Sequence, residues 1–134
     1  MNYEFDENGK FVELYDYYPL LKSFGYEIIL KVDDDDYQGD SRVLYKNNNC
    51  IGFLIFGWGS CSGCDALQAC NSMSEVEELR LSLLHCIKWF ISPEKALEYF
   101  LDKDWETEYY WHATETKEFV AKAIELLNKI KDEQ

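Results

Sequence analysis

Three of the five cysteines of this chain lie in one stretch, Gly57-Trp58-Gly59-Ser60-Cys61-Ser62-Gly63-Cys64-Asp65-Ala66-Leu67-Gln68-Ala69-Cys70. The Ser-Gly between Cys61 and Cys64 lets the backbone turn tightly enough for both sulfurs to reach one tetrahedral ion, and Cys70 offers a third thiolate. A strand-like run precedes the stretch and a helix-like pattern follows it. The sequence therefore predicts a Cys-rich zinc loop that joins the last strand of a sheet to the main helix.

The fourth zinc ligand is open at this point. Cys50, His85, Cys86, His112, a carboxylate or water can each supply it. Cys50 begins the strand that leads to the loop, which puts it about 20 Å away at about 3.3 Å per residue. Cys86 falls on the apolar stripe of a helix, where the ordinary role is that of a small buried side chain. We expect His112 to be the ligand, ahead of Cys86, because a loop-borne imidazole reaches a metal without distorting a helix.

Two other interpretations of the cysteines stay open. The plain one is that the thiols are small buried side chains in a Gly/Ser turn. The other is a thiol-disulfide oxidoreductase that uses the Cys61-x2-Cys64 pair, because a strand, a tryptophan and Cys-x2-Cys at a helix start resemble the thioredoxin arrangement. Neither Pro19 nor Pro93 is placed to be the cis-proline that this arrangement needs opposite the thiols. Zinc binding without catalysis is therefore the main prediction.

Length and composition limit the class of protein. A chain of 134 residues predicts a single acidic domain over 1–134. A hydrophobic content of 47% excludes a disordered chain, although the net charge is −13. The negative electrostatic field of such a chain repels nucleic acid and anionic lipid, so the expected partner is a basic protein. The odd cysteine count and the absence of a signal-like or membrane-length apolar run predict an intracellular protein with reduced thiols.

Hydrophobic periodicity predicts an α+β fold. The expected strands cover 26–32, 41–46 and 50–56, and the expected helices cover 11–24, 74–91, 93–102 and 115–131. Asn47-Asn48-Asn49 predicts a hairpin turn between the second and third strands, because asparagine tolerates left-handed backbone angles. Ser74-x-x-Glu77 predicts a capping box at the start of the main helix. We expect a small antiparallel sheet of about three strands packed against several helices.

Two acidic stretches are candidate partner-binding surfaces. The first comprises Asp33, Asp34, Asp35 and Asp36, and the second comprises Asp102, Asp104, Glu106 and Glu108. A calcium loop centred on Gly39 would use Asp34 and Asp36 as ligands, but its twelfth position is Tyr45 instead of glutamate. We therefore expect both stretches to be solvated and to attract a basic partner, with association faster at low salt.

The run Tyr37-Gln38-Gly39-Asp40 and the core Gly57-Trp58-Gly59-Ser60-Cys61-Ser62-Gly63-Cys64 resemble small phage and bacterial proteins. Weaker resemblance extends through Asp104-Trp105-Glu106 and Trp111-His112. With its size, acidity and zinc motif, the chain is similar to zinc-containing phage anti-CRISPR inhibitors of the type II RNA-guided nuclease. The resemblance implies a non-enzymatic protein of the host-cell cytoplasm that binds this nuclease and blocks loading of target DNA. The net charge of −13 agrees with this expected partner, because such nucleases hold nucleic acid in positively charged channels.

Overall fold

The computed structural model describes residues 16–60, 63, 65–108 and 112–133. Within these ranges one antiparallel sheet has four strands in sequence order, β1 (Glu27–Asp33), β2 (Gly39–Asn47), β3 (Cys50–Trp58) and β4 (Lys88–Phe90). The α+β prediction is confirmed. The expected three strands are present, and β4 adds a fourth at the edge beside β3.

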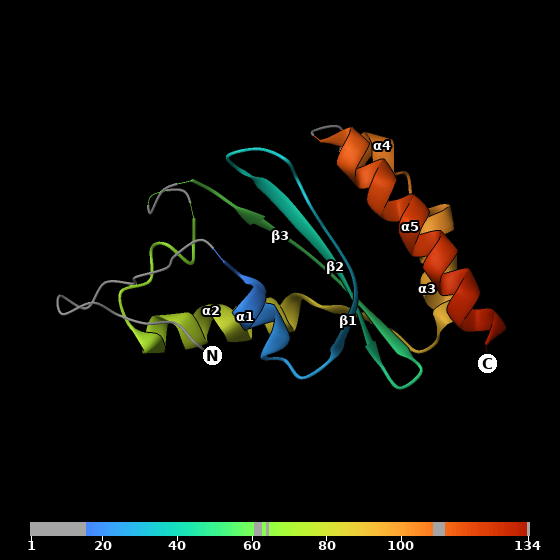
Figure 1. Ribbon diagram of the computed structural model, residues 1–134, viewed down its shortest axis with the longest axis horizontal. Helices are drawn as coiled ribbons and strands as arrows, with labels where there is room; N and C mark the ends of the chain where they lie inside the picture. Colours follow the sequence, from blue (N-terminus) through green and yellow to red (C-terminus); the bar gives the residue numbers. More distant parts are fainter. Residues whose placement is uncertain (1–15, 61–62, 64, 109–111, 134) are drawn as a thin grey trace.

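Helices cover both faces of the sheet (Figure 1). On one side lie α1 (Tyr18–Lys22) and α2 (Met73–Cys86), and on the other lie α3 (Pro93–Asp102), α4 (Trp105–Glu108) and α5 (Ala113–Asp132). Ser92 caps α3 as a hydrogen-bond acceptor for the Lys95 amide, and proline occupies the first turn of that helix. The predicted extents of α3 and α5 are confirmed to within two residues.

Alternation along β2 and β3 builds two hydrophobic cores. Val43, Tyr45, Leu54 and Phe56 pack with α1 and α2, whereas Leu44, Ile51 and Phe53 pack with α3 and α5. Successive side chains of a strand point to opposite faces, so neighbouring residues enter different cores. Both central strands are therefore buried on both sides, which explains why their sequences read as nearly continuous apolar runs.

The β2–β3 hairpin confirms the predicted asparagine turn. Asn47 pairs with Cys50, so that two residues connect the strands, and Asn48 has a left-handed φ of 55°. Primed two-residue turns require positive φ, which asparagine adopts at low cost. At the end of α1, Gly25 has a φ of 82°, the conformation expected of a glycine that terminates a helix.

The predicted end of the main helix is wrong. Helix α2 stops at Cys86, Ile87 is extended, and Lys88–Phe90 pairs with Ile51–Phe53 as β4. The apolar residues Ile87 and Phe90 satisfy a helical stripe and a strand equally well, and pairing with the free edge of β3 decides between them. The predicted capping box is also displaced: Ser72 caps α2 as acceptor for the Glu75 amide.

The predicted helix over 11–24 is confirmed only in its last part. Helix α1 begins at Tyr18 with Pro19 in its first turn, and residues 1–15 lie outside the described ranges. Proline suits a first turn because its missing N–H has no helical partner there. None of the described helices combines the length and apolar character that crossing a membrane requires.

Candidate functional site

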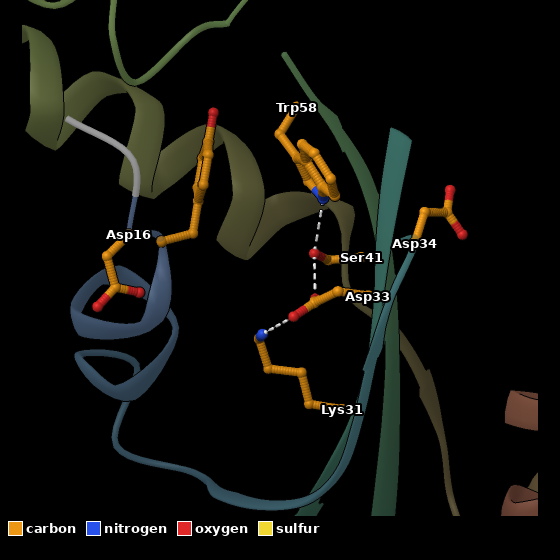
Figure 2. A pocket seen from close by; sticks show the side chains of 7 residues that line it. Asp16, Lys31, Asp33, Asp34, Ser41 and Trp58 are labelled. Carbon is orange, nitrogen blue, oxygen red and sulfur yellow. Dashed lines mark hydrogen bonds and ion pairs between the residues drawn. The ribbon is translucent and has the colours of Figure 1, made fainter. Parts of the chain in front are cut away.

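A cleft of about 290 Å³ opens between α1 and the adjoining ends of β1, β2 and β3 (Figure 2). Its lining residues are Asp16, Tyr17, Lys31, Asp33, Asp34, Ser41 and Trp58. Figure 2 shows Asp16 on one side of the cleft, facing the side chains of Lys31, Asp33, Ser41 and Trp58 from the sheet. Asp34 points away from the others in this view, toward the opposite side of the strands.

The sheet side of the cleft is an ordered polar chain. Trp58 Nε1 donates a hydrogen bond to Ser41 Oγ over 2.9 Å, and the Ser41 hydroxyl donates to Asp33 Oδ1. Lys31 Nζ pairs with the other oxygen of Asp33. Strand register brings the groups together. Asp33 of β1 pairs with Ser41 of β2, and Trp58 of β3 pairs with Gly39 at the start of β2. The chain fixes a tryptophan ring beside a half-exposed carboxylate.

Asp65 connects this cleft to the cysteine-bearing loop. It is 4% exposed, and its Oδ1 accepts from the Tyr17 hydroxyl and from the amides of Leu67 and Gln68. Its Oδ2 accepts from the Gly59 amide over 2.9 Å, which closes the loop between Gly59 and Asp65. Burial raises the pKa of the Tyr17 hydroxyl, which is therefore a hydrogen-bond donor at neutral pH.

Sequence reasoning missed the role of Asp65. A usable signal was present, because an aspartate followed by Ala-Leu-Gln has the pattern of a side chain that accepts from backbone amides two and three residues later. The neighbouring cysteines carry a stronger signal, which favours metal binding as the organiser of the loop. In the structure, the Asp65 carboxylate organises the described part of this loop through its contacts with Gly59, Leu67 and Gln68.

The cysteines occupy three different environments. Cys61 and Cys64 lie outside the described residues. Cys70 is buried and its Sγ donates to the Ala66 carbonyl over 3.3 Å. Burial raises the pKa of the Cys70 thiol, and the negative charges of Glu75, Asp65 and Glu78 raise it further. Cys70 is thus a protonated core side chain in this structure.

Two further cysteines bear on the choice of ligands. Cys86 is exposed, so the expectation of a small buried side chain there is wrong. Helix α2 buries Val76 and Leu83, and Cys86 at its last position faces away from that core. Cys50 begins β3 whereas the loop follows its other end at Trp58, in agreement with the expectation that Cys50 is too distant.

His112 lies on the other side of the sheet from Cys70. It precedes α5 with φ 55° and ψ 40°, and its Nε2 is 3.8 Å from Asp34 Oδ2 and from Asp36 Oδ2. Cys70 packs in the core under α1 and α2, whereas α5 packs on the opposite core. The structure therefore places His112 and Cys70 beside different cores, and the pairing of His112 with the cysteines of the loop stays a prediction that these positions do not favour.

Asp34 is also displaced from its predicted role as an exposed contact residue. Its side chain is 0% exposed and pairs with Arg42 Nη1 over 2.8 Å, with the Arg42 side chain 1% exposed. Arg42 Nη2 donates to Thr116 Oγ1 of α5, and the Asp40 amide donates to Asp34 Oδ2. Burial, followed by the charge of Asp34, raises the pKa of the Asp40 carboxyl. This buried polar cluster ties the β1–β2 connection to α5.

The remaining predicted contact residues differ in exposure and in their side-chain partners. Asp35, Asp36 and Asp102 are exposed, and Asp33 is half-exposed in the cleft. Asp104 accepts from the Thr107 amide and hydroxyl at the start of α4, and these hydrogen bonds lower the pKa of its carboxyl. Glu106 pairs with Lys117 over 2.7 Å, and the Glu108 side chain lies outside what the structure describes.

The chain matches no protein-family model, no curated protein and no solved structure.

Proposed function

We propose that this chain is a non-enzymatic acidic binding protein that engages a basic protein surface at the end of the sheet that carries the cleft. The observation that carries the proposal is the cleft itself, which Asp16 lines from the α1 side and Asp33 and Trp58 line from the sheet side. Carboxylates beside an aromatic face suit a lysine ammonium or an arginine guanidinium. Exposed Asp35 and Asp36 follow on the adjacent turn, and the net charge of −13 steers a basic partner toward the molecule.

Binding is favoured over catalysis by how the polar groups of the cleft are used. The Ser41 hydroxyl donates to Asp33, and Lys31 neutralises that carboxylate. A general base needs a lone pair directed at substrate. Each oxygen of Asp33 already has a partner, Ser41 on one and Lys31 on the other, so these groups are engaged with one another and support a shaped contact surface.

The partner class follows from the charge and from the resemblance of the cysteine stretch. A basic nucleic-acid-binding channel of a type II RNA-guided nuclease fits a domain of this charge, and its occupation would block loading of target DNA. The host-cell cytoplasm is the corresponding location. Zinc held by Cys61 and Cys64 with Cys70 remains part of the proposal, as a structural group of the loop that Asp65 already closes.

The zinc component has a direct test. Elemental analysis of protein purified without added metal is expected to find one zinc per chain that requires Cys61 and Cys64. Cys70 is the third predicted ligand, so Cys70→Ser is expected to weaken zinc retention as well. Its thiol loses the proton that it donates to the Ala66 carbonyl when it binds zinc. Zinc content that is unchanged in the Cys61→Ser/Cys64→Ser variant would exclude a site in the loop.

The binding proposal is tested by two charge-matched variants. Asp16→Asn/Asp35→Asn removes two charges at the cleft and keeps the Asp16 oxygen that accepts from the Tyr18 amide. Glu125→Gln/Asp132→Asn removes two exposed charges from the second half of α5. Binding to a purified, guide-loaded nuclease and its target-DNA loading are measured at several salt concentrations.

We expect the cleft variant to lower the association rate and its salt dependence more than the α5 variant does. Equal effects would show that only net charge matters and would remove the cleft from the proposal. Absence of any binding or inhibition by the unmodified protein would reject the nuclease as partner.

A further inference from the structure

Three metal-ligating side chains meet on the α5 side of the sheet, away from the cysteine loop. One donor atom each from Asp34, His112 and Glu115 lies within 4.8 Å of the other two. Asp34 follows β1, His112 precedes α5, and Glu115 is in the first turn of α5. The cluster therefore spans two parts of the chain that are more than seventy residues apart.

The imidazole of His112 is surrounded by carboxylates at one repeated distance. Its Nε2 is 3.8 Å from Asp34 Oδ2 and from Asp36 Oδ2, and its Nδ1 is 3.8 Å from Glu115 Oε2. These separations exceed the hydrogen-bond range. Two ligand atoms that each lie about 2.1 Å from one ion are at most about 4.2 Å apart. The 3.8 Å between His112 Nε2 and Asp34 Oδ2 meets this limit, whereas Glu115 lies 3.8 Å from the other ring nitrogen, so its side chain must turn toward the Nε2 side to share the ion. The side chain makes no capping hydrogen bond to α5.

Burial and charge separate this cluster from an ordinary acidic surface. The Asp34 side chain is 0% exposed, and the side chains of His112 and Glu115 are 23% and 24% exposed. Arg42 is the buried cation at the site, and it contacts Asp34 through Oδ1. Three carboxylates, those of Asp34, Asp36 and Glu115, lie near the ring, and the Arg42 guanidinium pairs with the first of them. Charges that leave water need a partner or a metal ion.

The carboxylate at the centre of the cluster is held in place in advance. Arg42 Nη1 donates to Asp34 Oδ1, the Asp40 amide donates to Asp34 Oδ2, and Thr116 orients Arg42 in turn. Metal ligands are characteristically fixed by such outer hydrogen bonds, which reduce the entropy lost on binding. Asp36 on the exposed turn is near enough to the ring to add a further oxygen, and water can complete the coordination.

We propose that Asp34, His112 and Glu115 form a binding site for one divalent transition-metal ion, separate from the cysteine loop. A set of one imidazole and two carboxylates suits zinc, manganese(II), iron(II) or cobalt(II) better than the soft ions that prefer thiolates. The bound ion joins the β1–β2 connection to the start of α5. The site is independent of the proposed partner and of any zinc at Cys61 and Cys64.

Cobalt(II) titration of the full chain, followed by optical spectroscopy, tests the site. Nitrogen and oxygen ligands give weak visible bands, whereas thiolate ligands add intense charge-transfer absorption. The Cys61→Ser/Cys64→Ser variant provides the same titration without the Cys-x2-Cys pair, and Cys70 remains buried in it. We expect one saturable equivalent with weak bands in this variant, and the same weak component in the unmodified chain.

Two variants and a matched control assign the ligands. His112→Asn keeps a residue that tolerates left-handed φ, and Glu115→Gln changes a partly exposed carboxylate without changing its size. Each is expected to weaken cobalt binding by roughly 10-fold or more, the range seen even for outer-shell losses. His85→Ala removes the other histidine of the chain, on exposed α2 surface, and is expected to leave affinity unchanged.

Several outcomes would overturn the proposal. One is the absence of a saturable cobalt spectrum in the Cys61→Ser/Cys64→Ser variant. Another is unchanged affinity in Glu115→Gln, whose fold is confirmed by circular dichroism. A third is equal loss in His85→Ala and His112→Asn, which would indicate adventitious binding at exposed imidazoles.

Discussion

Arg42 forms a buried ion pair on the α5 side of the sheet. Its side chain is 1% exposed, and its guanidinium pairs with Asp34 and donates to Thr116. Among the described residues, Arg42 Nε is the one buried side-chain nitrogen or oxygen without a hydrogen-bond partner. Desolvating two charges is costly, so the pair contributes little net stability while both members are present. Removal of one member leaves the other charged and buried.

The first prediction is a non-additive loss of stability at this pair. Arg42→Met is expected to lower the free energy of unfolding by about 3–5 kcal/mol, because Asp34 remains buried without its cation. Arg42→Met/Asp34→Asn is expected to be more stable than Arg42→Met alone, since asparagine keeps an oxygen for the Asp40 amide. Urea unfolding measures the free energy of unfolding of both variants. A double variant that is less stable than Arg42→Met would show that the pair is not the source of the loss.

The second prediction concerns thiol reactivity. Alkylation by iodoacetamide requires thiolate and access, so exposed Cys86 is expected to react faster than buried Cys70, whose pKa is raised. The measurement is peptide mass spectrometry over time at pH 8 with a chelator present, so that bound metal protects no thiol. Unfolded protein in urea provides the control in which both react alike. Cys70 reacting as fast as Cys86 in the folded chain would contradict its burial.

For individual side chains, the sequence predicts which groups are chemically active better than where they point. The run of four aspartates predicts that Asp33 and Asp34 share one exposed acidic loop, although β1 runs through Asp33. Because successive side chains of a strand point to opposite faces, Asp33 lies in the cleft and Asp34 lies against Arg42 on the other face. The position of His112 could not be predicted, because it depends on which face of the sheet α5 covers.

Elements that carry strong local signals were predictable. The asparagine hairpin, the Ser-Pro start of α3 and the long amphipathic α5 each follow from turn, capping or periodic patterns within a few residues. Strand β4 has three residues and no local signal that separates it from the end of α2. Its formation depends on the free edge of β3, which is far away in sequence.

The third prediction tests the packing that places β4. An added methyl group at Gly52 would lie 2.8 Å from Ile87 Cγ2 and 2.9 Å from Trp89 Cζ3, both on the segment that enters β4. Gly52→Ala is therefore expected to cost about 1–3 kcal/mol, the usual range for overpacking. Gly57→Ala on the same strand is the matched control, since its nearest neighbour would be Asp40 Oδ1 at 3.4 Å. Equal stability of the two variants by urea unfolding would contradict the close approach.

For the whole molecule, two hydrophobic cores hold together a chain with a large excess of negative charge. The cores share the central strands, with Val43 and Leu44 entering opposite sides. The charge of −13 acts against compactness, because like charges repel across the surface at low salt. The two effects have different salt dependence, since apolar burial is weakly affected by moderate NaCl whereas exposed charges are screened.

The fourth prediction follows from this balance. Exposed pairs such as Lys95–Glu98, Lys117–Glu106 and Lys122–Glu118 lose attraction when salt is added, but each is worth only about 0.2–1 kcal/mol. Screening between 0.01 M and 1 M NaCl shortens the Debye length from about 30 Å to about 3 Å and weakens the repulsion among all the excess carboxylates. We expect this repulsion to outweigh the attraction within the pairs, so the melting temperature at pH 7 is expected to rise with salt.

The control for this prediction is the variant Glu125→Gln/Asp132→Asn, which removes two exposed charges and none of these three pairs. It should melt higher than the unmodified chain at 0.01 M NaCl, and the difference should shrink at 1 M because screening already suppresses the repulsion that the substitutions relieve. The buried Arg42–Asp34 pair is the same in both proteins, and added salt screens a buried pair much less than exposed charges. A melting temperature that falls with salt in both would mean that the surface ion pairs outweigh the net charge.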